Sequence, residues 1–173
     1  MRTLIIILTT FIFNTYMFSQ IGYIDKINKL NKNGHKEGLW VENYNSITNE
    51  LYYKDGQKSG VFKSYTKKGK LSAIGEYTNG KITGTWYHFG DYGHLMSIQK
   101  DFRINNNTVI LDSGKRYVYP YKCYTINYYP NGVVEAEGFL LWEEDPEMDT
   151  AREYGEWKYY DETGKLIKTK EFK

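Results

Sequence analysis

The sequence predicts an all-β fold built from repeated antiparallel hairpins. Three observations lead to this prediction. Asn-Gly and Asp-Gly pairs recur along the chain, the segments between turns alternate apolar and polar residues, and a glycine repeatedly stands two positions before a large aromatic residue. Because these features recur together, we expect one repeated unit to extend over most of the 173 residues.

The turn signals define the repeat. The stretches "KNGHKEGLW", "KDGQKSGVF" and "TNGKITGTW" begin at Lys32, Lys54 and Thr78. In each, Asn-Gly or Asp-Gly is followed four residues later by a second glycine, and two residues after that by Trp or Phe. Asn-Gly and Asp-Gly adopt the positive φ angles that tight hairpin turns require. We therefore expect a tight hairpin turn in each copy.

The segments between the turns have the period of a β-strand. In "LSAIGEY", residues 71–77, one face carries Leu71, Ala73, Gly75 and Tyr77. The stretch "VEAEGFL" repeats this pattern 63 residues later, with Val134, Ala136, Gly138 and Leu140 on the same face. This alternation indicates antiparallel strands with one drier face.

The glycine that precedes each aromatic residue suggests a packing role. Alternation along a strand predicts that Gly84 and Trp86 point to the same side, as do Gly38 with Trp40 and Gly60 with Phe62. A glycine beside a ring leaves bare backbone on which a neighbouring aromatic residue can lie. We expect these residues to form a spine along the sheet. The alternative is an exposed aromatic platform for a ligand.

This pattern of Asn-Gly-x-x-x-Gly-x-Trp-x-x-Tyr followed by Gly-Lys-Leu resembles the bacterial variant of the MORN repeat. The resemblance covers residues 32–97 well and residues 128–172 more loosely. It implies an elongated, twisted antiparallel sheet made of successive hairpins. Proteins similar to this are often labelled as antitoxin components, so an intracellular antitoxin is one function that the resemblance implies.

The N-terminal residues differ from the rest of the chain. Arg2 precedes an apolar run from Leu4 to about Phe18. This run is short for a membrane span of ~20 residues and contains several polar side chains. It indicates a signal peptide, residues 1–19, followed by a repeat domain over residues 20–173. We expect an exported protein (periplasmic, cell-surface or secreted) with no stable membrane span after cleavage; an uncleaved anchor is the alternative.

Two insertions interrupt the repeat, near residues 104–127 and 143–153. The first predicts an extra hairpin with its turn at Asp112–Gly114. The second carries five carboxylates: Glu143, Glu144, Asp145, Glu147 and Asp149. Such oxygens suit Ca²⁺, but their spacing matches no calcium loop. We expect a solvated acidic loop, with a cation site as the alternative.

Few residues suggest catalysis. The only histidines are His35, His88 and His94; the last two flank Asp91, but we expect a strand and a turn to point them apart. The single cysteine, Cys123, excludes an intramolecular disulfide and is expected to be a buried apolar side chain. A net charge of +2 gives no sign of nucleic-acid binding.

These observations predict a non-catalytic, exported interaction or structural protein, with no catalytic, metal or cofactor residue to name. Its expected partner is another protein or a component of the cell envelope. An enzymatic or cation-dependent module with its site in the insertions is the first alternative, and the intracellular antitoxin is the second.

Overall fold

The computed structural model describes residues 27–110, 114–142 and 151–173, and every regular element among them is a β-strand. The strands are β1 (Lys29–Leu30), β2 (Lys36–Tyr44), β3 (Ile47–Lys54), β4 (Gln57–Thr66), β5 (Leu71–Thr78), β6 (Lys81–Phe89), β7 (Leu95–Ile104), β8 (Val109–Ile110), β9 (Arg116–Tyr117), β10 (Tyr121–Tyr128), β11 (Val134–Trp142), β12 (Arg152–Tyr160) and β13 (Leu166–Phe172).

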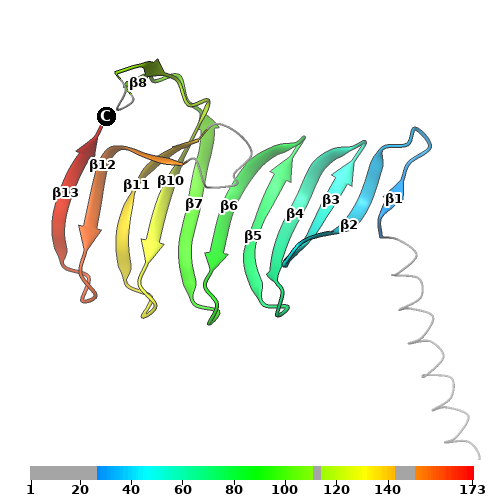
Figure 1. The fold of residues 1–173 in the computed structure, drawn as a ribbon, viewed down its shortest axis with the longest axis horizontal. Helices are drawn as coiled ribbons and strands as arrows, with labels where there is room; N and C mark the ends of the chain where they lie inside the picture. Colours follow the sequence, from blue (N-terminus) through cyan, green and yellow to red (C-terminus); the bar gives the residue numbers. More distant parts are fainter. Residues whose placement is uncertain (1–26, 111–113, 143–150) are drawn as a thin grey trace, which may run out of the picture.

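Eleven of these strands form one open antiparallel sheet in the order β1-β2-β3-β4-β5-β6-β7-β10-β11-β12-β13. Each strand therefore lies beside its neighbour in sequence, except where β8 and β9 intervene. Figure 1 shows the strands side by side along the length of the molecule. The predicted all-β meander of antiparallel hairpins is confirmed.

Two-residue turns close the hairpins at Asp55-Gly56 and Asn79-Gly80. Both residues of each pair have a positive φ, at 48° and 80° in the first turn and 51° and 76° in the second. These angles match the right-handed twist of the flanking strands, and few residues other than Asn, Asp and Gly accept them cheaply. The sequence signal and the turn agree at these two places.

A second class of hairpin turn is one residue longer than these two-residue turns. In the connection between β4 and β5, Gly69 N donates to Thr66 O and Thr66 N donates to Lys70 O, both at 2.8 Å. The glycine alone has a positive φ in this class, which also closes at Gly34, Gly93, Gly132 and Gly164. Asn33-Gly34 belongs to this class, so Gly34 alone supplies the positive φ of its tight turn. With this additional residue, only the glycine adopts the left-handed backbone conformation.

The glycines before the aromatic residues have a positive φ, and at Gly60, Gly84 and Gly155 the strand pairing shifts as in a bulge. Gly38, Gly60, Gly84 and Gly155 have φ of 72°, 97°, 69° and 69°. Around Gly84 the pairing with β5 shifts from Glu76↔Thr83 to Ile74↔Tyr87, so β6 carries extra residues there. A Cβ atom at Gly84 would meet the side chain of Glu76, on the face opposite Trp86. The expectation that Gly84 and Trp86 share a face is therefore wrong, because the bulge breaks the alternation.

The bare backbone under the tryptophans belongs to other glycines. The ring of Trp86 lies over Gly75 of β5, and the ring of Trp157 lies over Gly138 of β11. The indole nitrogen of Trp157 donates to the carbonyl of Phe139 at 2.9 Å, which fixes the ring across the neighbouring strand. We call the face of the sheet that carries Trp86 and Trp157 the tryptophan face.

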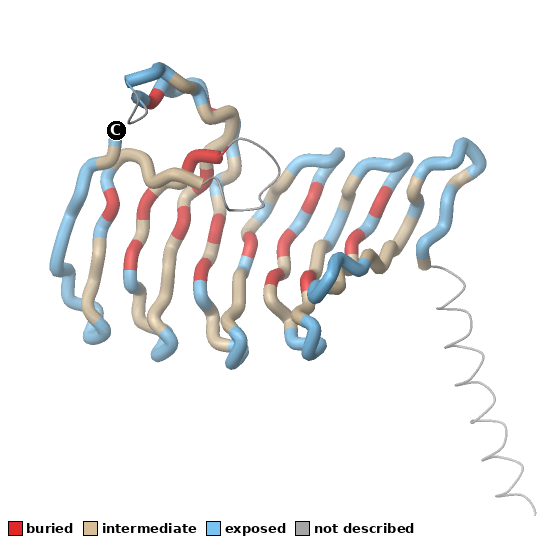
Figure 2. The backbone as a smooth tube through the Cα atoms, in the orientation of Figure 1, coloured by how far each residue is buried: buried red, intermediate tan, exposed pale blue. Residues whose placement is uncertain are grey.

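The core of this sheet lies on the tryptophan face. Trp86 is 4% exposed and Trp157 is 2% exposed. Phe62 stacks on Trp86, and Tyr77 meets its edge, with ring centroids 5.1 and 5.2 Å away. Buried positions form a band along the middle of the strands (Figure 2). A spine of packed rings is confirmed, and rings this buried do not form the exposed platform that was the alternative.

The first insertion does contain an extra hairpin, in which β8 and β9 pair through Val109↔Tyr117 and Ile110↔Arg116. Residues 111 to 113 of its turn lie outside the described residues. The insertion is shorter than the expected 104–127, because Tyr121–Tyr128 form β10 of the main sheet. Residues 143–150 of the second insertion and the predicted signal peptide also lie outside the described residues.

Candidate interaction groove

The sheet is open at one seam, between the upper halves of β6 and β7. Register pairs join these strands only from Trp86↔Gln99 to Phe89↔Leu95. Above Trp86, β6 pairs only with β5, and Arg103 and Ile104 of β7 pair only with β10. The two strands diverge at this level in Figure 1. Among the described residues, the seam therefore leaves two strand edges facing each other without a ladder between them.

A bulge in β7 accompanies this opening. Asp101 has a positive φ of 58°, and the pairing with β10 shifts between Tyr124↔Lys100 and Lys122↔Arg103. Bulges bend a strand and increase its local twist. The bend directs the end of β7 towards β10 and away from β6.

The missing turn after β7 explains why the gap stays open. In the other copies, a turn glycine donates to the carbonyl of an earlier strand: Gly56 N to Lys36 O at 2.9 Å and Gly80 N to Lys58 O at 2.8 Å. Ile82 stands at the equivalent position of β6. The chain after β7 continues into the first insertion, so the part of the chain that the structure describes has no tight turn there to donate to the Ile82 carbonyl.

A groove of about 370 Å³ lies in this gap. Its lining comes from the β5–β6 turn, β6, β7, β10 and the end of β11, and consists of Thr78, Gly80, Lys81, Ile82, Thr83, Phe102, Arg103, Ile104, Tyr121 and Trp142. The groove therefore brings together residues about sixty positions apart in sequence. Its volume is in the range of small ligand-binding sites.

One wall of the groove is aromatic. Phe102 meets Trp142 edge-on with ring centroids 5.7 Å apart, and Tyr121 stacks on Trp142 at 6.0 Å. Trp142 is only 7% exposed, so these contacts hold the wall in place. Ile104 is 58% exposed and offers an aliphatic surface beside it. This wall suits an apolar side chain.

The charged residues of the lining are both basic. Lys81 and Arg103 are the cations, and the described lining contains no carboxylate. The guanidinium of Arg103 lies 5.3 Å from the ring centre of Phe139, on the face of the sheet opposite Trp142. Successive side chains of an extended segment point to opposite faces, so a partner with an acidic residue next to an apolar one would be complementary to this lining.

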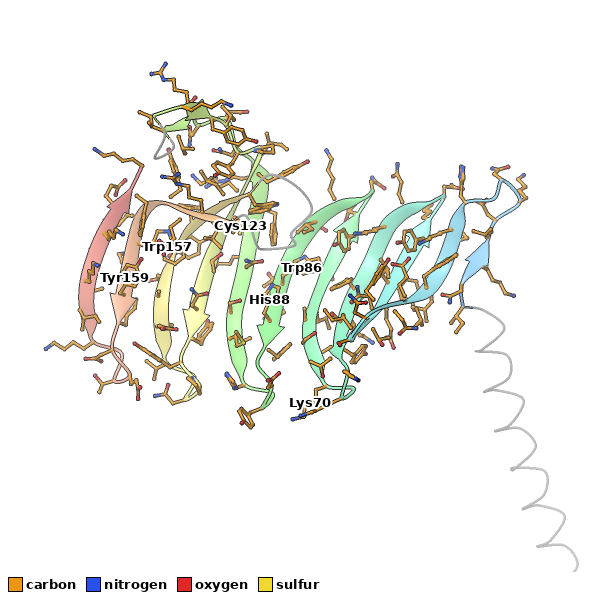
Figure 3. All side chains as sticks on the ribbon, viewed as in Figure 1. Lys70, Trp86, His88, Cys123, Trp157 and Tyr159 are labelled. Atoms are coloured by element: carbon orange, nitrogen blue, oxygen red, sulfur yellow. The ribbon has the colours of Figure 1, made fainter. Side chains whose placement is uncertain are left out.

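The histidines that the sequence singles out do not form a site together. Nε2 of His88 lies 3.3 Å from the amide oxygen of Gln99, and its ring stacks beside Trp86 (Figure 3). His94 lies over the backbone of Gly90, where a Cβ atom would overlap its ring. In residues 27–110, 114–142 and 151–173, no three His, Cys, Asp or Glu side chains gather closely enough to hold a metal ion.

Burial lowers the pKa of His88 below its usual value, with a smaller opposing effect from the hydrogen bond to Gln99. Burial within the tryptophan face therefore favours the neutral imidazole. Its partners are Gln99 and the neighbouring rings, and this environment gives it a packing role.

Cys123 is fully buried in β10, as the sequence predicted. Burial raises the pKa of its thiol to about 11. Its Sγ lies 3.6 Å from the hydroxyl of Thr125. A thiol in this state is a poor nucleophile because the thiolate is the reactive form.

The five carboxylates of the second insertion lie outside the described residues, so the expectation of a solvated loop stays a prediction. The part of the chain that the structure describes contains no helix long and apolar enough to cross a membrane. No model of a protein family matches the chain. A search of curated proteins also finds no relative.

Sequence reasoning missed the groove. Its main components, Ile82, Ile104 and Trp142, look like ordinary strand residues when each is considered alone. The signal that could have located it is the tight turn that the insertion after β7 replaces. A strand that loses its turn also loses the donor that would close the neighbouring seam.

Proposed function

We propose that this protein is a non-catalytic binding module that holds an extended segment of another protein in the groove between β6 and β7. The observation that carries the proposal is the unpaired edge of β6, which lies beside an aromatic wall and two cations. A strand edge supplies hydrogen bonds to any extended backbone, and flanking pockets select its side chains.

The backbone of Ile82 is the expected anchor for such a segment. Lys81 flanks the two-residue turn and pairs with Thr78, so its amide and carbonyl point towards β5. The amide and carbonyl of Ile82 point the other way, into the seam. A segment lying there would donate to the Ile82 carbonyl as Gly80 donates to Lys58 in the preceding copy.

The side chains define the class of segment. The aromatic wall favours a large apolar residue, and Lys81 with Arg103 favours an acidic residue near it. We therefore expect an extended acidic peptide with an aromatic or aliphatic residue. The partner that supplies it is an exported protein or a protein of the cell envelope.

Selection from a display library of random peptides against the full chain tests the proposal. The selected peptides should carry an acidic residue beside an apolar one, and Ile104→Asp should abolish their binding. Ile110→Asp is a matched control, because Ile110 is also 58% exposed but lies on the β8–β9 hairpin outside the lining. Binding that survives Ile104→Asp would refute the groove as the site.

The proposed export of the protein has its own test. If residues 1–19 are a signal peptide, the mature protein begins near Gln20. N-terminal sequencing of the protein purified from its native cell should find this new terminus. An intact Met1 on protein in the cytoplasmic fraction would contradict export and would favour the intracellular antitoxin.

A further inference from the structure

The face of the sheet opposite the tryptophans has an unusual order of residues. We call it the isoleucine face. One uninterrupted row of paired residues crosses it from β2 to β13, consisting of Val41, Glu50, Lys63, Ile74, Tyr87, Ile98, Ile126, Glu137, Lys158 and Thr169. Residues directly opposite each other in a ladder share a face, so all ten point to the same side.

The centre of this row is apolar and its flanks are charged. The four central positions are Ile74, Tyr87, Ile98 and Ile126, and Tyr87 is 39% exposed. On one side follow Lys63 and then Glu50; on the other follow Glu137 and then Lys158. An apolar centre with a charged rim is the arrangement of a protein interface.

The order of the charges makes the row complementary to a second copy of itself that runs in the opposite direction. When the row is turned end to end, Glu50 meets Lys158, Lys63 meets Glu137, and Ile74 meets Ile126. Tyr87 then meets Ile98 at the centre. Such self-complementarity is what an interface between two identical chains requires, since each contact occurs twice about a twofold axis.

We propose that two copies of this chain pack isoleucine face to isoleucine face about a twofold axis that runs parallel to the strands. This axis places each strand opposite the one at the mirrored position of the row. Paired sheets of this kind lie about 10 Å apart, so the central apolar side chains interdigitate. The long side chains of the flanking strands form ion pairs around them.

A neighbouring row on the same face adds one apolar pair to this arrangement. Val61 of β4 is 39% exposed and lies one step above Lys63, whereas Phe139 of β11 lies one step above Glu137. The same axis places Val61 opposite Phe139 of the second copy. The rest of this row is polar on the central strands, with Glu76, Thr83 and Lys100, so it contributes this one apolar contact.

The charges also disfavour the other face-to-face dimer. An axis perpendicular to the strands would place each strand opposite itself, so Glu50 would face Glu50 and Lys63 would face Lys63. Like charges in contact across an interface are strongly unfavourable. The charge pattern of the row therefore favours a second copy of the chain as the partner and one orientation of that copy.

Cross-linking gives a direct test of this contact. Glu50 and Lys158 lie on β3 and β12, seven strand spacings apart, which is about 34 Å at 4.8 Å per spacing. A zero-length carbodiimide cross-link between them can therefore form only between two chains. We expect mass spectrometry of the cross-linked full chain to identify this pair, and sedimentation equilibrium to give the mass of a dimer.

Charge exchange tests the orientation. Glu50→Lys alone should weaken the dimer at least about tenfold, the change that 1.4 kcal/mol produces. The double variant Glu50→Lys with Lys158→Glu should restore it. Tyr87→Lys should also weaken the dimer, while Tyr92→Lys is the control, because Tyr92 is 92% exposed in the β6–β7 turn, away from this face.

Two results would overturn the proposal. One is a chain that remains monomeric at every concentration and salt tested. The other is a dimer whose mass is unchanged by both Tyr87→Lys and Glu50→Lys, which would place the contact elsewhere. Circular dichroism of each variant confirms that a lost dimer does not reflect a lost fold.

Discussion

The ring of Trp157 lies so close over Gly138 that a Cβ atom there would stand 2.5 Å from three of its ring atoms. Trp86 and Gly75 repeat this relationship four strands earlier in the sheet, with the ring even closer to the backbone. Because the sheet has a single layer, each tryptophan must find its packing surface on the sheet itself. The glycine supplies that surface, and the bulge that precedes each tryptophan directs the ring onto it.

Removal of the ring should cost much of the stability of the protein. Trp86→Ala deletes a side chain that is 4% exposed, and such changes typically cost about 3–5 kcal/mol. Thermal or urea unfolding measures this loss. A midpoint that stays within error of the wild type would show that the ring contributes little to packing.

The glycine and the ring should also be energetically coupled. Gly75→Ala introduces a methyl group where the ring lies, and overpacking of this kind costs about 1–3 kcal/mol or more. In the Trp86→Ala background, the same Gly75→Ala change should cost much less, since the ring is gone. A double-mutant cycle measures the coupling. Additive effects of the two changes would contradict the contact.

His88 should make stability depend on pH. Burial lowers its pKa in the folded state, while the unfolded chain keeps a value of about 6.5. Below pH 6.5 the unfolded state therefore binds the proton first, so stability should fall as the pH drops towards the folded pKa. His88→Gln should lose this part of the pH dependence. His35→Gln is the control, because His35 is exposed, and an equal effect from both variants would contradict the prediction.

Cys123 should be inert while the sheet is folded. Its side chain is fully buried and its thiol has a pKa of about 11, so a thiol reagent at pH 8 finds neither access nor thiolate. The reagent should react fully in denaturant, and in native buffer only at the rate of opening. Rapid labelling of the native protein would show that the strands around β10 open readily.

The second insertion should be dispensable for folding. Other copies close the equivalent connection with a short turn, so deletion of residues 143–150 with a new Asn-Gly turn should leave the melting curve nearly unchanged. Melts of both proteins with Ca²⁺ and with chelator test the alternative. Stabilisation by Ca²⁺ in the wild type alone would indicate a cation site in these carboxylates.

Local patterns in the sequence were sufficient to predict the strands and the hairpins. The pair Asn79-Gly80 is sufficient to predict its own turn, and the burial of Cys123 follows from its residue type. The role of Gly84 could not be predicted in the same way, because a bulge is defined by the register of the partner strand. Alternation alone placed Gly84 on the wrong face.

The groove depends on an even less local feature. The insertion after β7 was visible in the sequence, but its consequence appears across the sheet, where Ile82 of β6 lies opposite no turn. Ile104 and Trp142 approach it only because β10 and β11 continue the sheet beyond the insertion. Contacts of this kind follow from the assembled strand order, which no single segment encodes.

Amide hydrogen exchange at Ile82 tests most directly whether this edge binds an extended segment. We expect this amide to exchange rapidly in the free protein and to become protected when a selected acidic peptide is added, because the peptide backbone then pairs with the seam. Amides between β4 and β5, where the ladder is complete, should keep the same protection in both states. An Ile82 amide that is already protected in the free protein, or that is unchanged by bound peptide, would contradict an open seam as the binding site.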